Sequence, residues 1–344
     1  MPTISVIVPC RNEEKCIATS VQSILAQEGL GDDFEVIVVD GMSQDETRKI
    51  LARIARHSAN LRIINNRAQT TPCAMNRGIE AARGRYVAIL GAHAEYACDY
   101  LRTCLDLLNE HPDVCCVGGP IHSVGISPFG RAVASVMAHP VGVGNARHRH
   151  PTYEGYAEGA CYPVFRKEVF DKVGLYDEVL MRNQDDEFNY RLSRYGEKIF
   201  ISPRARCRYF VRETPSQLFR QYFQYGYWRV AVLRKHRRPA SLRQVVPPLF
   251  MSCMCAVAVL GQVLPGWWRL SAAVLPVGYG ATLLIVGASE VRKAGCRVAC
   301  LFPVAAAIIH TAYAAGFACS VLKGKNPNPR DALWPKPEVH NPRS

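Results

Sequence analysis

Three long stretches without a charged residue constrain this chain more than any other feature. They are Gln244–Trp268, Leu270–Ser289 and Val298–Leu322. Each is long enough to cross the roughly 30 Å hydrocarbon core of a bilayer as a helix. A buried helical bundle is the alternative, but three such stretches in succession favour membrane helices, although several prolines leave their limits open. We therefore expect a membrane region over residues 244–322 and a polar tail over residues 323–344.

The segment before these stretches is basic. The formal net charge is +13, and residues 204–243 are rich in arginine and lysine with one acid, Glu213. A basic segment next to apolar helices favours the anionic cytoplasmic leaflet over nucleic acid as its partner. Arg292, Lys293 and Arg297 fit a cytoplasmic loop, whereas the basic tail after Lys323 conflicts with the positive-inside tendency, so one stretch could lie in the interface instead.

Cysteine usage and the N-terminal sequence indicate the compartment. The fourteen cysteines form no CxxC pair and no zinc-finger spacing, which favours a reducing compartment over a disulfide framework. The opening sequence MPTISVIVPCRNEE is typical of a strand and has no basic leader before a long apolar run. We expect the N-terminal domain to be cytosolic.

The first ninety residues alternate short apolar runs with segments of helical spacing. We expect strands at Ile4–Pro9, Phe34–Val39, Leu61–Ile64 and Tyr86–Leu90, each followed or preceded by a helix. This order predicts an α/β fold with a mainly parallel sheet, in which ligands bind beyond the carboxyl ends of the strands. Pro9, Asp40 and the segment after Leu90 should therefore converge on one crevice.

One helix start has a specific sequence signal. Ser43 precedes a helical pattern and Glu46 follows it by three residues, the spacing of a capping box. We predict that Ser43 caps this helix, and that Ser43 and Asp45 are capping residues rather than ligands.

Seven motifs occur in an order that resembles the family 2 glycosyltransferases of GT-A fold, most of all the membrane glucosyltransferases of succinoglycan-type exopolysaccharide synthesis. They are SVIVPCRNEE, EVIVVDGMSQDET, AMNRGIEAARGRYVAIL, GAHAEY, HPVGVGNARHR, NQDDEFNYRL and QYFQYGYWR. The resemblance covers almost the whole chain. It implies a GT-A domain over residues 1–240 that binds a nucleotide-sugar donor.

The resemblance also implies donor-binding residues near the first two strands. Asp40 matches the aspartate that binds the nucleoside, and the alternative is that Asp40 only begins a turn. Around it, the base pocket is implied to be lined by Pro9, Arg11, Asn12 and Glu13.

The segment Gly91-Ala92-His93-Ala94-Glu95 departs from the family. The family usually has Asp-x-Asp here, which binds Mg²⁺ or Mn²⁺ bridging the donor diphosphate, and related enzymes have Asp-Ala-His. In this chain Gly91 replaces the first acid. Three interpretations stay open: weakened metal binding through His93, which suits Mn²⁺ better than Mg²⁺, a shifted site that uses Glu95, or lost catalysis.

Two further elements follow. The family has Glu-Asp where this chain has Gln184-Asp185, and its aspartate is the general base of inverting transfer, so we expect Asp185 as base, with Asp186 second. An acidic helix start is the alternative.

The segment Gln221–Arg229 imperfectly resembles Gln-x-x-Arg-Trp, so Arg229 could hold a phosphate, or the helix could be interfacial. The loop from His139 to His150 could contact a phosphorylated acceptor or be a surface loop.

These features predict a multi-pass protein of the inner (cytoplasmic) membrane with a cytosolic catalytic domain. The resemblance implies inverting transfer of a hexose, with glucose from UDP-glucose preferred, to a polyprenyl-diphosphate-linked glycan. A single addition is preferred to polymerisation because the chain has few membrane segments. The alternative is a catalytically silent glycan-binding or assembly subunit of a polysaccharide synthesis complex. Gly91 favours this alternative, whereas Asp40 and Asp185 oppose it.

Overall fold

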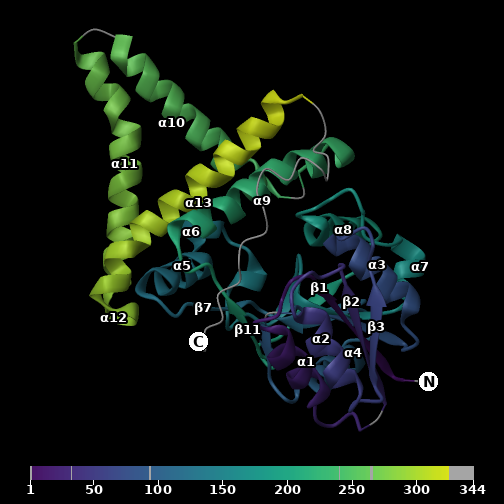
Figure 1. The fold of residues 1–344 in the computed structure, drawn as a ribbon. Helices are drawn as coiled ribbons and strands as arrows, with labels where there is room; N and C mark the ends of the chain where they lie inside the picture. Colours follow the sequence, from purple (N-terminus) through teal and green to yellow (C-terminus); the bar gives the residue numbers. More distant parts are fainter. Residues whose placement is uncertain (1, 32, 93, 240, 264–265, 325–344) are drawn as a thin grey trace. The chain divides into compact units, whose positions relative to one another are not determined.

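The computed structural model describes residues 2–31, 33–92, 94–239, 241–263 and 266–324 (Figure 1). Within these residues the chain forms two compact units. The first contains the residues up to His122 together with Ala146–Phe210. The second contains Ser123–Asn145 and the residues from Val211 onward. The domain limits at residues 240 and 244 stay a prediction.

An eight-stranded sheet forms the centre of the first unit. Its strands are β1 (Ile4–Cys10), β2 (Phe34–Asp40), β3 (Leu61–Asn65), β4 (Tyr86–Ile89), β6 (Cys116–Gly119), β8 (Gly155–Ala157), β9 (Cys161–Arg166) and β10 (Ile199–Ile201). Their order is β3-β2-β1-β4-β9-β6-β10-β8. The first four are mutually parallel, as are β6 and β10, whereas β9 runs antiparallel between β4 and β6. The predicted mainly parallel α/β sheet is confirmed.

Helices cover both faces of this sheet. They are α1 (Ile17–Leu25), α2 (Thr47–Ala55), α3 (Thr71–Ala81), α4 (Tyr100–Glu110), α7 (Glu168–Val173) and α8 (Gln184–Arg194). Val6 and Val8 of β1 pack in one apolar cluster with α1, α2 and α4, whereas Ile7 packs in a second with α3, α7 and α8. This alternation follows from the period of two in a strand, and burial on both faces explains the continuous apolar runs of β1 and β2.

Three further strands are short and form a second sheet. The strand β5 (Ala94–Tyr96) pairs antiparallel with β11 (Cys207–Phe210). The strand β7 (His122–Val124) lies where the chain passes from the first unit to the second. These strands leave Glu95 opposite Arg208.

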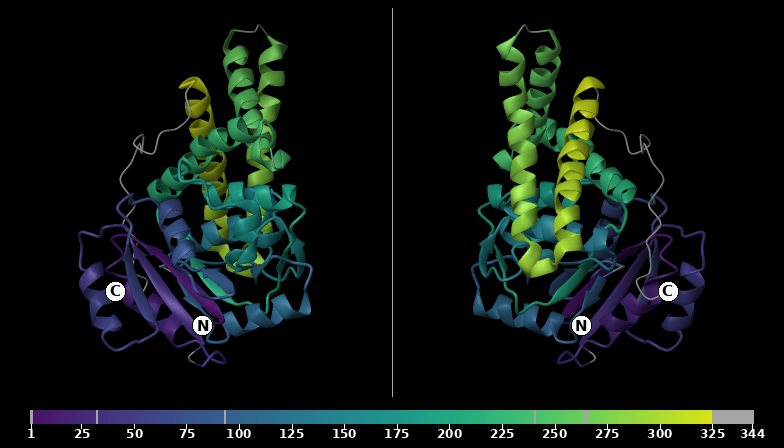
Figure 2. Two further views of the ribbon diagram at one scale, coloured as in Figure 1. Left: turned by 90° about the vertical axis from the view of Figure 1, so that its right-hand side faces the viewer. Right: turned by 90° about the vertical axis from the view of Figure 1, so that its left-hand side faces the viewer.

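The second unit is helical. Its helices are α5 (Pro128–Ala138), α6 (Pro140–Val143), α9 (Pro215–His236), α10 (Val246–Val263), α11 (Trp267–Ser289), α12 (Val291–Ala294) and α13 (Cys296–Leu322). Three helical segments, Val246–Val263, Leu270–Ser289 and Cys296–Leu322, are long and apolar enough to cross a membrane, as the three uncharged stretches predicted. The helices α10 and α11 pack against each other (Figure 2). Because little of their surface is buried within the protein, their composition suits a lipid environment.

Two glycines bring α9 and α13 into direct backbone contact. A Cβ atom at Gly226 would lie 2.0 Å from the Tyr313 carbonyl oxygen, and one at Gly316 would lie 2.0 Å from the Phe223 carbonyl oxygen. No larger residue fits at either position, so the two helices cross as closely as backbones allow.

Candidate active site

The carboxyl ends of three neighbouring strands meet at one edge of the sheet. Cys10 at the end of β1 lies opposite Asp40 at the end of β2. On the other side of β1, the Leu90 N–H after β4 donates to the Ile7 carbonyl at 2.9 Å. The predicted convergence of these three segments is confirmed, and it places them where ligands bind in parallel sheets.

Asp40 is completely buried, and its carboxylate is bonded within its own loop. It accepts hydrogen bonds from the Ser43 hydroxyl at 2.5 Å and from the Ser43 N–H, and Arg48 Nε lies 3.5 Å away. These partners give Asp40 a clear role in shaping the loop after β2. Nucleoside binding by Asp40 stays a prediction, and it would require exchange of one of these bonds.

The loops after β1 and β2 are hydrogen-bonded to each other. Asn12, in the left-handed region at φ 53°, donates from its N–H to Ser43 Oγ at 2.9 Å and accepts from the Gln44 N–H at 2.9 Å. The Glu13 N–H donates to Thr47 Oγ1 at 2.8 Å. These long-range bonds fix the backbone of the predicted base pocket.

The capping-box prediction for Ser43 is wrong. The helix α2 begins at Thr47, its N-cap position is Glu46, and no side chain caps it there. Ser43 lies three residues before that N-cap position, and its hydroxyl donates to Asp40 and accepts from the Asn12 N–H instead. Asp45 provides the local support expected of it by accepting from the Thr47 N–H at 3.0 Å.

Arg11 and Pro9 are half-buried beside this loop. The Arg11 stem lies over Gly41, where a Cβ atom would be 3.1 Å from Arg11 Cβ. The buried Arg11 Nε has no hydrogen-bond partner among the described residues. A buried donor in this state is unusual and marks a position where an external acceptor would fit.

The segment after β4 is fixed by its backbone. The Gly91 carbonyl accepts from Ser20 Oγ at 3.0 Å, and the Gly91 N–H donates to the Tyr96 hydroxyl at 2.6 Å. His93 lies outside the described residues. Glu95 pairs with Arg208, with 3.6 Å between Oε2 and Nη1. The metal-binding roles of His93 and Glu95 stay predictions.

Asp185 is the second residue of α8, just after Asn183 in the left-handed region. Desolvation by the surrounding protein raises the pKa of Asp185 to about 7, the negative charge of Asp186 adds to this increase, and Arg182 opposes it. The Asp185 side chain is exposed, so water moderates the shift, but its direction also follows from the like charge beside it. A carboxylate with this pKa suits a general base near neutral pH.

The rest of α8 holds Asp185 in place. Glu187 is buried and pairs with Arg191 at 3.0 Å, and Arg191 donates to the carbonyls of Val173 and Leu175 at 2.7 Å. Phe188 packs in the core beneath. These contacts anchor the helix from its inner side, so its first turn presents two acids without taking part in the core.

Two residues at the start of β9 were not predicted from the sequence. The Tyr162 ring stands against Gly91, since a Cβ atom there would be 3.0 Å from Tyr162 Cε1. The buried Cys161 thiol is close enough to Asp185 for that charge to raise its pKa, in addition to burial. Nothing local identifies these residues, because β9 enters the sheet antiparallel and far along the chain from β4.

Arg229 lies in α9, in the second unit, and is buried there. The predicted phosphate contact of Arg229 stays a prediction.

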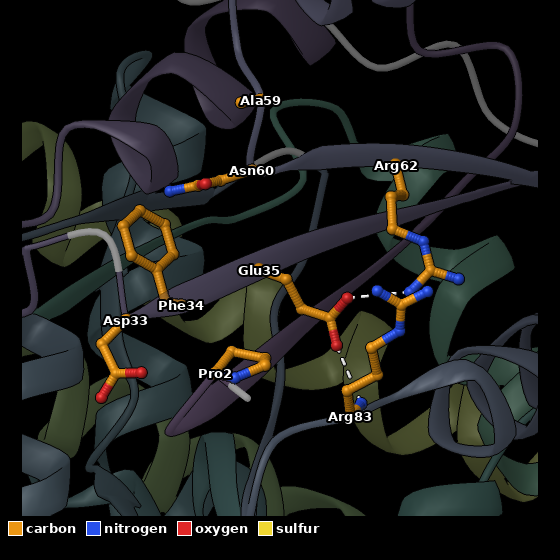
Figure 3. A pocket seen from close by; sticks show the side chains of 8 residues that line it. All are labelled: Pro2, Asp33, Phe34, Glu35, Ala59, Asn60, Arg62 and Arg83. Carbon is orange, nitrogen blue, oxygen red and sulfur yellow. Dashed lines mark hydrogen bonds and ion pairs between the residues drawn. The ribbon is translucent and has the colours of Figure 1, made fainter.

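A pocket of about 330 Å³ lies at the opposite, amino end of the strands (Figure 3). It is lined by Pro2, Asp33, Phe34, Glu35, Ala59, Asn60, Arg62 and Arg83. Glu35 accepts hydrogen bonds from Ser5 Oγ at 2.7 Å, the Arg83 N–H at 2.8 Å and Arg62 Nη1 at 2.8 Å. Burial alone would raise the pKa of Glu35, but these bonds together lower it. The pocket is built around an internal network.

The fold is of GT-A type, and comparison with solved structures agrees. The mannosyltransferase PcManGT from Pyrobaculum calidifontis, solved with GDP-Man and Mn²⁺, is 20% identical with a TM-score of 0.59, covering 94% of this chain and 88% of that one. TarS from S. aureus, solved with UDP-GlcNAc, is 17% identical with a TM-score of 0.52, covering 94% and 93%.

Sequence comparison then gives the family. The profile described as glycosyl transferase family 2 matches residues 5–174. The succinoglycan biosynthesis protein ExoA of Rhizobium meliloti is 31% identical over 320 residues, covering 91% of this chain and 93% of that protein. A dolichyl N-acetyl-alpha-D-glucosaminyl phosphate 3-beta-D-2,3-diacetamido-2,3-dideoxy-beta-D-glucuronosyltransferase of Methanococcus voltae is 25% identical, covering 68% and 75%. The chain belongs to glycosyltransferase family 2 and is a glycosyltransferase.

Proposed function

We propose that this glycosyltransferase transfers a hexose, with glucose from UDP-glucose as the preferred donor, to a lipid-linked glycan in exopolysaccharide synthesis. The observation that carries the proposal is Asp185, an exposed carboxylate at the head of α8 whose pKa is raised by desolvation and by the charge of Asp186. It occurs in a chain that aligns over most of its length with a succinoglycan biosynthesis protein.

In this proposal Asp185 is the general base of an inverting transfer. The acceptor hydroxyl attacks the anomeric carbon and gives its proton to the Asp185 carboxylate. The new carbon–oxygen bond forms as the bond to the diphosphate oxygen breaks, and that electron pair leaves with the nucleoside diphosphate. A raised pKa makes Asp185 a stronger base than an ordinary aspartate while leaving much of it ionised near neutral pH.

The donor nucleoside is proposed to bind at the carboxyl ends of β1 and β2. The rigid loop of Asn12 and Glu13 and the half-buried Arg11 provide polar groups there. Asp40 supports this site from within the loop. Pro9, at the end of β1, is proposed to complete the wall.

A divalent cation in the donor site would supply positive charge to the leaving diphosphate. The residues predicted to hold it, His93 and Glu95, are not shown in a metal-binding arrangement. Gly91 has no side chain, Glu95 is paired with Arg208, and the described residues contain no cluster of three His, Cys, Asp or Glu side chains placed for a metal. His93 lies outside the described residues. No step above is assigned to a cation, and activity with and without chelator tests its need.

The membrane arrangement is part of the proposal. We place α10, α11 and α13 across the inner membrane and the first unit in the cytosol, where a polyprenyl-diphosphate-linked acceptor would be elongated. A polysaccharide synthesis complex is a proposed partner. Because salt does not reverse helix insertion, the protein should stay in membranes washed with high salt. Release into the wash would contradict this placement.

The decisive experiment incubates membranes containing the protein with a panel of labelled nucleotide-sugars and extracted lipid-linked acceptors. The wild type should label a glycolipid from one donor, and Asp185→Asn should not. Transfer from a donor other than UDP-glucose would correct the sugar and keep the mechanism. Failure with every donor and acceptor would favour the silent-subunit alternative.

A further inference from the structure

A short 3₁₀ turn, η1 (Arg147–Arg149), holds two arginines next to the sheet. The Ile121 N–H donates to the His148 carbonyl at 2.8 Å, and Ala146 at the base of the turn is buried. The Arg149 N–H closes the turn by donating to the Ala146 carbonyl at 2.9 Å. The turn is therefore a fixed part of the first unit.

The two arginines of η1 differ in their surroundings. Arg147 is exposed, donates to the Tyr156 carbonyl at 2.9 Å and lies over the Tyr153 ring. Arg149 is half-buried, and its buried Nη1 has no hydrogen-bond partner among the described residues. Because a buried donor without an acceptor destabilises the fold, such a group in a native protein calls for an explanation, and an acceptor that arrives from outside provides one.

Arg149 and Asp185 both lie close enough to the Cys161 thiol, at the start of β9, to act on it electrostatically. Burial raises the pKa of the Cys161 thiol most, and the charges of Arg149 and Asp185 then act on that pKa in opposite directions. Tyr162, the next residue, touches Gly91, where the family has an acid. The first two residues of β9 therefore connect these groups: Cys161 lies near Arg149 and Asp185, and Tyr162 lies against Gly91.

Three other arginines of the first unit are paired with acids. Arg204 pairs with Glu110, Arg206 with Asp99 and Arg208 with Glu95. These are exposed pairs on the segment around β11. Arg149 has no acid of this kind within the described residues.

We propose that Arg149 binds the diphosphate of the nucleotide-sugar donor and stabilises the negative charge on the leaving nucleoside diphosphate, an inference that rests on the proposed function. A guanidinium matches phosphate oxygens with two parallel hydrogen bonds and stays charged at all relevant pH values. Its charge assists as the bond between the anomeric carbon and the diphosphate oxygen breaks. In the family, an acid at the position of Gly91 holds a metal ion beside the diphosphate. Because this chain has Gly91 there, Arg149 provides part of the positive charge that the metal ion supplies in the family.

The test is nucleotide binding by the purified full-length protein in detergent, measured by calorimetry. The probes are UDP, GDP, UMP and GMP, each with EDTA and with Mn²⁺. Arg149→Gln should weaken binding of whichever diphosphate the wild type binds by about 10-fold or more, and that of its monophosphate by less than about 2-fold. Arg149→Lys should fall between. Arg147→Gln is the matched control and should bind like the wild type.

Each outcome decides the question. Unchanged diphosphate binding by Arg149→Gln overturns the role of Arg149 but not the proposed function. An equal loss for diphosphate and monophosphate, or a lowered melting temperature, gives Arg149 a structural role and also overturns the inference. A wild type that binds neither diphosphate overturns the proposed function and this inference with it.

Discussion

In the part of the chain that the structure describes, both ends of the central sheet carry buried polar groups, but those at the amino end are hydrogen-bonded within the protein and several at the carboxyl end are not. At the amino end, Glu35 is bonded to Ser5, Arg62 and Arg83. At the carboxyl end, Arg11, Arg149 and Gln184 each have a buried polar atom without a hydrogen-bond partner among the described residues. The satisfied network stabilises the fold, whereas the unsatisfied atoms cost stability and are explained by a ligand that completes them.

The two carboxylates of this comparison have opposite pKa shifts. Hydrogen bonds lower the pKa of Glu35, whereas desolvation and Asp186 raise that of Asp185. A group that stabilises the fold in its charged form should lower stability when removed. Removing a group whose charged form is disfavoured by the fold should lower the rate of catalysis instead of the stability.

Asp185→Asn should produce the largest effect on activity. We expect the rate of transfer to fall at least ~10²-fold, because general-base catalysis is typically worth 10²–10⁴-fold. Nucleotide binding should hardly change, and the melting temperature should not fall, since ionised Asp185 is already disfavoured in the fold. Normal turnover would transfer the role of base to Asp186, to be tested in the same assay.

Glu35→Ala should produce the largest effect on stability. Removing the carboxylate leaves the Ser5 hydroxyl without its acceptor and breaks the bonds to the Arg83 N–H and to Arg62, so unfolding should become easier by about 1–3 kcal/mol. Because the pKa of Glu35 is lowered from 4.5, its stabilisation is present above that pH and is lost as the pH falls through the lowered value.

Thermal unfolding in detergent at two pH values measures this effect. The rate of transfer per folded molecule should stay near the wild-type value. Asp106→Asn, which removes an exposed helical pair with Arg102, is the control and should change little. A large loss of activity in folded Glu35→Ala would show that the amino-end pocket takes part in function.

Asp186→Asn should move the pH dependence of transfer. Removing the like charge lowers the pKa of Asp185, so more of the base is ionised in acid, and the acidic limb of kcat/KM should shift to lower pH. A profile from about pH 5 to pH 9 measures the shift. A shift to higher pH, or no shift, would show that the charge of Asp186 does not raise the pKa of Asp185.

Glu95→Gln should produce the smallest effect. Its carboxylate pairs with Arg208 across two short strands, and an exposed pair of this kind contributes little, so activity should stay within about 2-fold. Titration with Mn²⁺ and Mg²⁺ in both proteins provides the comparison. A large loss that excess Mn²⁺ restores would return Glu95 to a metal site.

The sequence predicted the parts of this fold that depend on local pattern. The runs at β1, β2 and β4 are apolar and β-branched, so their existence and their shared carboxyl edge could be inferred. Ser43 was misassigned because the spacing to Glu46 is local, whereas its real partners, Asp40 and Asn12, depend on two strands meeting.

The candidate site shows the same division between residues that a local motif identifies and residues that it does not. Asp185 belongs to a recognisable motif, whereas Arg149 lies in an irregular basic loop that could equally have been a solvated surface. Its difference from Arg147 two residues earlier depends on burial and on contacts with Tyr153 and Tyr156. No spacing in the sequence carries that information.

The glycine contact between α9 and α13 has a mechanical consequence. With Gly226 and Gly316 pressed against opposing carbonyls, the two helices cannot slide without a clash, so they tilt as one lever. In the membrane arrangement proposed above, a bilayer thinner than the apolar length of α13 would make that helix tilt. The same tilt would pass to α9, which is in backbone contact with α13. In the proposed membrane arrangement, a change in bilayer thickness would therefore move α9 and α13 together.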